Sequence, residues 1–120
     1  MNTKKKLIYI SGKMGEMKLS DATIEKFRVA QDRLVNEGWA VINPANDVFQ
    51  REAMKHVKAE SRKWKDLKVD LYARLLLLDM HYLALCDTIY MLKDWRYSPG
   101  AIVEHAYAVA CKKPIIYEEL

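Results

Sequence analysis

The stretch Leu7-Ile-Tyr-Ile-Ser-Gly12 decides the fold. It is a short apolar run of the kind found in buried β-strands, and it ends at a glycine that opens a loop. In the segment that follows, Ser20 or Asp21 can cap a helix, and Gly38 stands where a glycine usually ends one. Residues 7–11 are therefore expected to form the first strand of a strand–loop–helix unit.

The rest of the chain repeats this alternation of strand and helix. We expect further strands over residues 39–43, 88–92 and 114–117, and further helices over 66–85 and 99–111. Residues 47–65 are polar and ambiguous, and fit one irregular helix followed by a loop. The alternation predicts one α/β domain over residues 1–120, Rossmann-like (flavodoxin-like) and doubly wound, with a mostly parallel sheet of four to five strands in three layers.

The apolar residues of two expected helices indicate how each is buried. Helix 66–85 is apolar over most of its circumference and is therefore expected to be well buried. The first helix carries a broad apolar stripe made of Ile24, Phe27, Val29, Ala30, Leu34 and Val35.

The composition is that of a globular protein, with 120 residues, 51% hydrophobic and 30% charged. The basic cluster 4–6 runs into an apolar segment too short for a secretory signal or a membrane span, so we expect a cytoplasmic protein with no membrane association. Cys86 and Cys111 stand in apolar contexts without metal-ligand spacing. They are expected to be buried free thiols rather than a disulfide.

Most of the net charge of +4 comes from one segment, residues 51–68. A solvated helix face is the favoured interpretation, while attraction of phosphate and contact with nucleic acid stay open. Because nothing else in the chain looks like a nucleic-acid-binding module, nucleic acid is not an expected partner. The basic residues of the segment are Arg51, Lys55, Lys58, Arg62, Lys63, Lys65 and Lys68.

Ligands of doubly wound sheets bind beyond the carboxyl ends of the strands, which nominates the loops 12–16 and 93–100. In the second loop, Ser98 suits the N-cap of a helix and Pro99 its first residue. Free N–H groups at such a helix start, with the Ser98 hydroxyl and the bare backbone of Gly100, would make an anion site. An ordinary helix cap is the alternative.

Two acidic residues could perform chemistry beside this loop. Glu104 lies on the helix, about 9 Å along its axis from Ser98. Asp79 shares a helix face with apolar residues, so it either satisfies nearby donors or lines a cavity. Two converging carboxylates are the minimum for chemistry at a glycosidic carbon. Asp87, at a helix-to-strand junction, is expected to have a structural role.

Metal and cofactor sites are not expected from this sequence. His56, His81 and His105 lack the spacing of metal ligands, and no Walker or GxGxxG loop is present.

At this point the chain resembles the nucleoside 2-deoxyribosyltransferase superfamily, including its branch of 2′-deoxynucleoside 5′-monophosphate N-glycosidases and especially its short, uncharacterised phage and bacterial members. The likeness covers nearly the whole chain, and its motifs are fairly specific in their order. The motifs that carry it are Tyr9-Ile-Ser-Gly12 with Lys13 and Met14, Asn43-Pro-Ala45, Asp79 eight residues before Asp87, and Ser98-Pro-Gly-Ala-Ile-Val-Glu104.

The resemblance implies catalytic roles for three residues. Glu104 would be the nucleophile at C1′ of the sugar. Tyr9 and Asp79 would position that carboxylate and the sugar or base, and Asp79 would also assist departure of the base.

The resemblance also implies how the substrate, a nucleoside or nucleotide, is held. Ser98 and Gly100 would bind its 5′-phosphate or hydroxyl, and Gly12, Lys13 and Asn43 are expected at the substrate as well. A homodimer or larger homo-oligomer is implied, because in this superfamily a C-terminal residue of the neighbouring subunit often completes the site.

Three functions remain open at this point. The first is an enzyme that hydrolyses or transfers the N-glycosidic bond of a nucleoside or nucleoside 5′-monophosphate. The second is a non-catalytic module that binds a nucleotide or a nucleotide-derived signal. The third is a nucleic-acid-binding protein that uses the basic segment 51–68. Only the first requires Glu104 and Asp79 to converge on one sugar.

Overall fold

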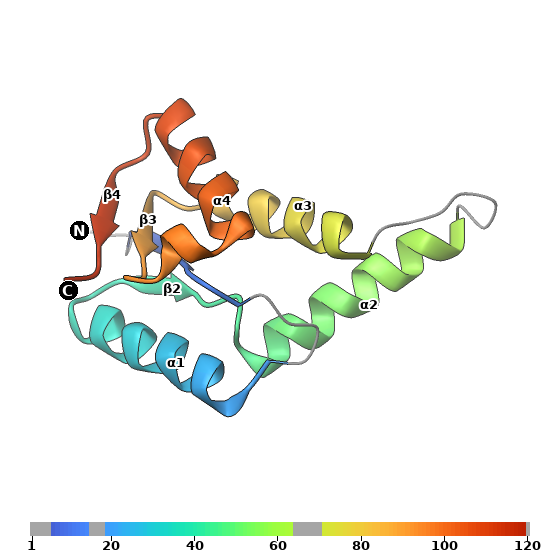
Figure 1. The fold of residues 1–120 in the computed structure, drawn as a ribbon, viewed down its shortest axis with the longest axis horizontal. Helices are drawn as coiled ribbons and strands as arrows, with labels where there is room; N and C mark the ends of the chain where they lie inside the picture. Colours follow the sequence, from blue (N-terminus) through green and yellow to red (C-terminus); the bar gives the residue numbers. More distant parts are fainter. Residues whose placement is uncertain (1–5, 15–18, 64–70, 120) are drawn as a thin grey trace, which may run out of the picture.

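The computed structural model describes residues 6–14, 19–63 and 71–119 (Figure 1). Strands and helices alternate as the sequence predicts, and most predicted boundaries are correct to within one residue. The elements are β1 (Leu7–Ser11), α1 (Asp21–Asn36), β2 (Ala40–Ile42), α2 (Asp47–Lys63), α3 (Leu71–Ala84), β3 (Thr88–Met91), the 3-10 helix η1 (Trp95–Tyr97), α4 (Pro99–Ala110) and β4 (Ile115–Tyr117).

The four described strands form one parallel sheet with the order β2-β1-β3-β4. Strand β1 is central, since Tyr9 pairs with Ile42 of β2 on one side and with Ile89 of β3 on the other. This order confirms the Rossmann-like, flavodoxin-like prediction, in which ligands bind where the strand order reverses beside the first strand.

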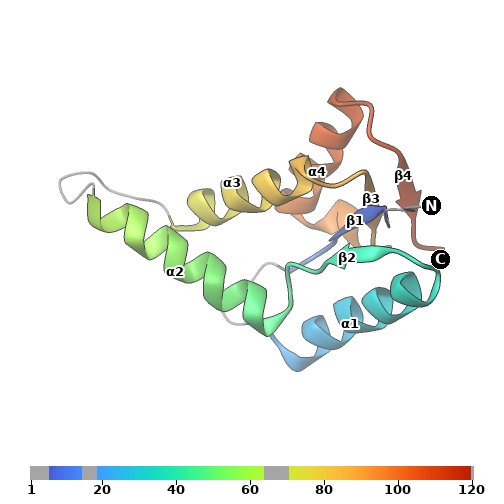
Figure 2. The same ribbon diagram turned by 180° about the vertical axis from the view of Figure 1, so that it is seen from behind.

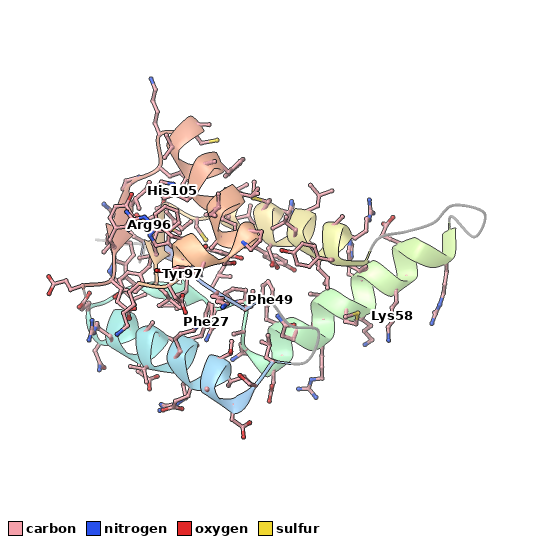
Figure 3. The ribbon with its side chains drawn as sticks, viewed as in Figure 1. Phe27, Phe49, Lys58, Arg96, Tyr97 and His105 are labelled. Atoms are coloured by element: carbon pink, nitrogen blue, oxygen red, sulfur yellow. The ribbon has the colours of Figure 1, made fainter. Side chains whose placement is uncertain are left out.

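Helices cover both faces of the sheet, which gives the predicted three layers (Figures 1 and 2). Alternate residues of a strand point to opposite faces. Ile8 and Ile10 of β1 therefore pack against α1, whose Phe27 lies on that face (Figure 3). Tyr9 points the other way and packs with Leu83 of α3 and with residues of α4.

The boundaries of α1 follow from local chemistry. The Ser20 hydroxyl accepts a hydrogen bond from the N–H of Thr23, which makes Ser20 the N-cap, as one of the two predicted candidates. Gly38 has φ of 97°, the left-handed conformation that ends helices and that glycine adopts without strain.

The structure corrects the predicted burial of two helices, α1 and α3. Val29 is 49% exposed and Val35 is also exposed, because only the narrow face with Phe27, Ala30 and Leu34 reaches the sheet. In α3, which starts at residue 71 in the described part, Tyr72 and Leu77 are exposed, so the prediction of a well-buried helix is wrong for one face.

The ambiguous segment 47–65 is one continuous helix, α2, up to Lys63. In Figures 1 and 2, α2 and α3 lie side by side and project beyond the sheet as an arm. The predicted helical residues 66–70 lie outside the described residues.

Two further predictions concern single residues. Asp87 is structural, because its N–H donates to the Leu7 carbonyl and its carboxylate accepts from the Leu7 N–H, both at 2.8 Å. Cys86 is a buried free thiol, as predicted, but Cys111 is exposed, because it follows the last turn of α4 at the surface. Among the described helices, none is long and apolar enough to cross a bilayer.

Gly12 ends β1 where the backbone meets the side chain of Leu92, which is fully buried. A Cβ atom on Gly12 would lie 2.6 Å from Leu92 Cδ1 and 2.8 Å from its Cβ, closer than packed atoms approach. We predict that Gly12→Ala lowers the free energy of unfolding by about 1–3 kcal/mol, the usual cost of overpacking a core. Urea titration followed by circular dichroism measures this.

The matched control is Gly100→Ala, whose added Cβ would lie 3.4 Å from its nearest neighbour, the Tyr72 hydroxyl. It should cost much less stability than Gly12→Ala. Equal losses in the two variants would contradict the packing argument.

Candidate active site

Glu104 is buried in the middle of α4, with only 4% of its surface exposed. The Tyr9 hydroxyl donates to its Oε2 at 2.6 Å, and the Ser11 hydroxyl donates to its Oε1 at 2.7 Å. Each carboxylate oxygen thus accepts one short hydrogen bond and keeps a second lone pair. The alternative of a surface glutamate is excluded.

The local sequence explains this arrangement. Tyr9 and Ser11 are two residues apart on β1, so their side chains point to the same face of the sheet. Ser98 caps α4 by accepting from the N–H of Ala101 at 3.2 Å, with Pro99 as first helical residue. Glu104 lies on the face of α4 that contacts β1.

Sequence reasoning missed Ser11, although it stands within the motif 9–12. The alternation of strand side chains was the signal that could have found it.

Burial changes the protonation of the two residues in this contact. Removal from water raises the pKa of Glu104 to about 7, although the hydrogen bonds from Ser11 and Tyr9 oppose the rise. Burial, followed by the nearby Glu104 charge, raises the pKa of Tyr9 well above its usual value. Tyr9 therefore stays a hydroxyl donor to Glu104.

Asp79 is the second acid at the site, and its side chain is half-buried. Burial, with a smaller contribution from the Glu104 charge, raises its pKa to about 8. Within the described part of the chain, no hydrogen bond to the Asp79 carboxyl is found. Of the two explanations for an acid on this apolar face, the cavity is therefore the one observed. Both acids therefore keep their protons to higher pH than exposed carboxyls do, and the pKa of Asp79 is raised further than that of Glu104.

Both acids line one cavity of about 280 Å³ at the carboxyl ends of β1 and β3. Residues of α2 and α3 form one side, and the loop after β1 and the start of α4 form the other. The wall is mostly apolar, and its apolar side chains are Met14, Leu19, Ala53, Met54, Leu75 and Leu76. Gln50 and the exposed Tyr72 add polar groups, so the cavity suits a ligand with an apolar body and a few polar groups.

The helix start at Ser98 and Gly100 forms part of the cavity wall, as predicted. The Ala101 N–H is used by the Ser98 cap and the Ile102 N–H by the Ser98 carbonyl. Pro99 has no N–H, so the donors left for a ligand are the Gly100 N–H and the Ser98 hydroxyl proton. No lysine or arginine is found among the described residues of the wall.

The structure brings together most of the predicted site residues, but not all. Glu104, Asp79, Gly12, Ser98 and Gly100 line the cavity, and Tyr9 supports Glu104 from behind.

Two predicted substrate-binding residues lie elsewhere. Asn43 is buried at the end of β2, where its amide donates to Gln31 and its carbonyl oxygen accepts from Ala45. It lines a separate cavity of about 360 Å³. Lys13 is exposed and does not line the main cavity.

Lys13 nevertheless contributes through its backbone. Its N–H donates to Asp94 Oδ1 at 3.0 Å, and its carbonyl accepts from Lys26 Nζ at 2.8 Å. Lys26 Nζ also pairs with Asp94 Oδ2 at 2.5 Å. Two residues from distant parts of the chain, Lys26 and Asp94, therefore hold the loop that carries Gly12 and Met14. Sequence reasoning gave no signal for either of them.

One comparison bears on this arrangement of residues. A family model described as "Domain of unknown function (DUF4406)" matches residues 6–117. The chain belongs to this family. Comparison with curated proteins and with solved structures gives no match.

In this DUF4406 domain the site offers acid–base and nucleophilic chemistry. Within the described ranges, no three His, Cys, Asp or Glu residues are grouped so that they could hold a metal ion. The groups that face the cavity are a carboxylate steadied by two hydroxyls, a protonated carboxyl, and the donors of a helix start. This set can attack an electrophilic carbon and supply a proton to a leaving group.

The raised pKa of Asp79 predicts how stability depends on pH. A carboxyl whose pKa is higher in the folded than in the unfolded protein stabilises the fold at low pH, and this stabilisation is lost as pH rises through about 8. The Tm of the wild type should therefore fall between about pH 6 and pH 9. Asp79→Asn should remove part of that fall and raise Tm at pH 9 by on the order of 5 °C.

Thermal unfolding of both proteins at the two pH values measures this. Exposed Asp32→Asn is the control and should retain the wild-type fall. If Asp79→Asn shows the same fall as the wild type, Asp79 is not desolvated in the folded protein.

Proposed function

We propose that the protein cleaves or transfers the N-glycosidic bond of a nucleoside or nucleoside 5′-monophosphate. Glu104 is the nucleophile, Asp79 is the acid, and Tyr9 and Ser11 position Glu104. The observation that carries the proposal is the Glu104 carboxylate, which is buried, accepts hydrogen bonds from two hydroxyls and faces the same cavity as Asp79, an acid whose pKa is raised by burial. The resemblance of the motifs to the nucleoside 2-deoxyribosyltransferase superfamily supports the same assignment.

In the first step, a Glu104 oxygen forms a bond to C1′ of the sugar as the bond from C1′ to the base nitrogen breaks. The base nitrogen keeps the bonding electron pair and takes the proton of Asp79. In the second step, water or another base attacks C1′, gives its proton to the Asp79 carboxylate, and releases Glu104. Configuration at C1′ is retained overall, because each step inverts it.

The hydrogen bonds of Tyr9 and Ser11 suit this cycle. They orient the carboxylate toward the cavity and lower the pKa of Glu104 against the effect of burial. Both hydroxyls also remain bonded to Glu104 after one of its oxygens has joined the sugar. No metal is needed for these steps.

The cavity wall favours a nucleoside-sized substrate. Its apolar side chains can contact a planar base, while the Ser98 hydroxyl and the Gly100 N–H can bind a 5′-hydroxyl or 5′-phosphate. A homo-oligomer, in which a neighbouring subunit completes the cavity, belongs to the proposal because the resemblance implies it.

Incubation of the protein with a panel of nucleosides and 5′-monophosphates, followed by chromatography of released base, tests the proposal. We expect release from at least one substrate class. Glu104→Gln should lower the rate by on the order of a thousandfold or more, because it removes the nucleophile. It should leave the fold intact, because the amide oxygen still accepts from one of the two hydroxyls and the amide NH2 can donate to the oxygen of the other.

Exposed Glu37→Gln is the matched control and should retain wild-type activity. If Glu104→Gln releases base at a rate near that of the wild type, Glu104 is not the nucleophile. If the wild type binds nucleotides by calorimetry but releases no base from any substrate, the protein is instead a nucleotide-binding module.

The pH profile of kcat/KM should be bell-shaped. The reaction needs ionised Glu104, which appears as pH rises through about 7, and protonated Asp79, which is lost as pH rises through about 8. Asp79→Asn should lower the rate and remove the alkaline limb, because no proton is left to lose. An alkaline limb that survives unchanged in Asp79→Asn would assign the acid to another group.

A further inference from the structure

The helix α2 carries a row of four cations on one face: Arg51, Lys55, Lys58 and Arg62. Their spacing of four, three and four residues places them on one side of the helix, over about 16 Å of its axis. All four are exposed, and Lys58 lies on the side of α2 that is turned away from α3 (Figure 3). We call these four residues the cation row.

The cation row exists only because α2 is continuous. If the helix had ended well before Lys63, the same charges would lie partly on a helix and partly on a loop. The sequence alone left this undecided, and a solvated helix face was the favoured interpretation of the charges. Within the described residues, no member of the row forms an ion pair with a carboxylate. The row is therefore a positive strip, without a direct carboxylate partner among the described residues, on an arm of the molecule.

The apolar side of α2 is already occupied. Ala53 and Val57 are buried, and Gln50, Ala53 and Met54 line the main cavity. The helix therefore has no free apolar face to insert into a bilayer, which a surface-bound amphipathic helix requires. A linear, hydrated polyanion fits a straight row of cations better than a membrane does.

The row also leads to the cavity. Arg51 and Lys55 each directly follow a residue of the cavity wall, Gln50 and Met54, whereas Lys58 and Arg62 lie farther along the arm. The cavity wall itself has no lysine or arginine among its described residues. The cations that could bind phosphate groups therefore lie outside the cavity. They follow α2 from Arg62 toward Arg51, which is next in sequence to a residue of the cavity wall.

We propose that α2 binds the phosphate backbone of a single-stranded nucleic acid along the cation row, with one nucleotide placed at the cavity. A single strand is the fitting occupant, because one row of cations follows one backbone and the cavity can only accept a base that is not stacked in a duplex. The placement at the cavity rests on the proposed function. Binding along α2 does not.

The test uses a fluorescein-labelled oligothymidylate of about twelve nucleotides and fluorescence anisotropy at several salt concentrations. Four phosphate contacts to a single strand predict a slope of log K against log salt of about −2.8. Affinity should then fall about 50-fold between roughly 50 and 200 mM salt. Lys58→Gln with Arg62→Gln should halve the slope to about −1.4, since two contacts remain.

Lys6→Gln with Lys112→Gln is the matched control. It removes the same charge from exposed residues at the amino ends of β1 and β4, away from the cavity, and should retain the wild-type slope. An unchanged slope in the α2 variant, or an equal loss in the control, overturns the proposal. So does binding to phosphatidylserine vesicles that depends on the row when the oligonucleotide does not bind.

The same variants separate this inference from the proposed function. Lys58→Gln with Arg62→Gln should release base from a free nucleoside at the wild-type rate. If the wild type binds the oligonucleotide as expected but releases base from no substrate, the proposed function fails and the binding along α2 stands. If it releases base from nucleosides but binds the oligonucleotide with no dependence on the row, only the present inference fails.

Discussion

The buried contact of Glu104 with Tyr9 and Ser11 is the interaction on which the site depends. A carboxylate can be buried only if its oxygens accept hydrogen bonds, and here both donors come from the central strand β1. Because the donors belong to β1 and the acceptor to α4, the contact also sets how α4 lies on the sheet. The packing of α4 on the sheet and the position of the reactive carboxylate therefore depend on the same two hydrogen bonds.

The pKa of the second acid, Asp79, depends in part on the first, Glu104. Glu104 contributes to the raised pKa of Asp79, so the two carboxyls cannot easily be ionised together. Two acids in one cavity thus take different protonation states near neutral pH without a metal or a neighbouring cation.

The sequence predicted most of the fold because its signals were local. The run at residues 7–12, the cap at Ser98 and the glycine at position 38 each act within a few residues, and the structure confirms all three. The glutamate at 104 was found for the same reason, by its distance along one helix. Each of these features depends on the spacing of residues that are close together in the sequence.

The rest depended on contacts between distant segments. Asn43 follows a strand end just as a ligand-binding residue would, but its amide is used by Gln31 of α1. Nothing near Asp94 in the sequence indicates that it holds the backbone of Lys13. The course of residues 47–63 was equally undecided, because a polar helix acquires its buried face only when α3 and the cavity lie against it.

The two cysteines differ in a way that has a practical use. Cys86 is only 3% exposed, and burial raises the pKa of its thiol to about 11, so it reacts slowly with electrophiles. Cys111 is exposed just past the end of α4, toward the amino ends of the strands and away from the cavity. The native chain therefore presents a single accessible thiol, to which a maleimide fluorophore can be attached at one defined point without engineering and without blocking the site.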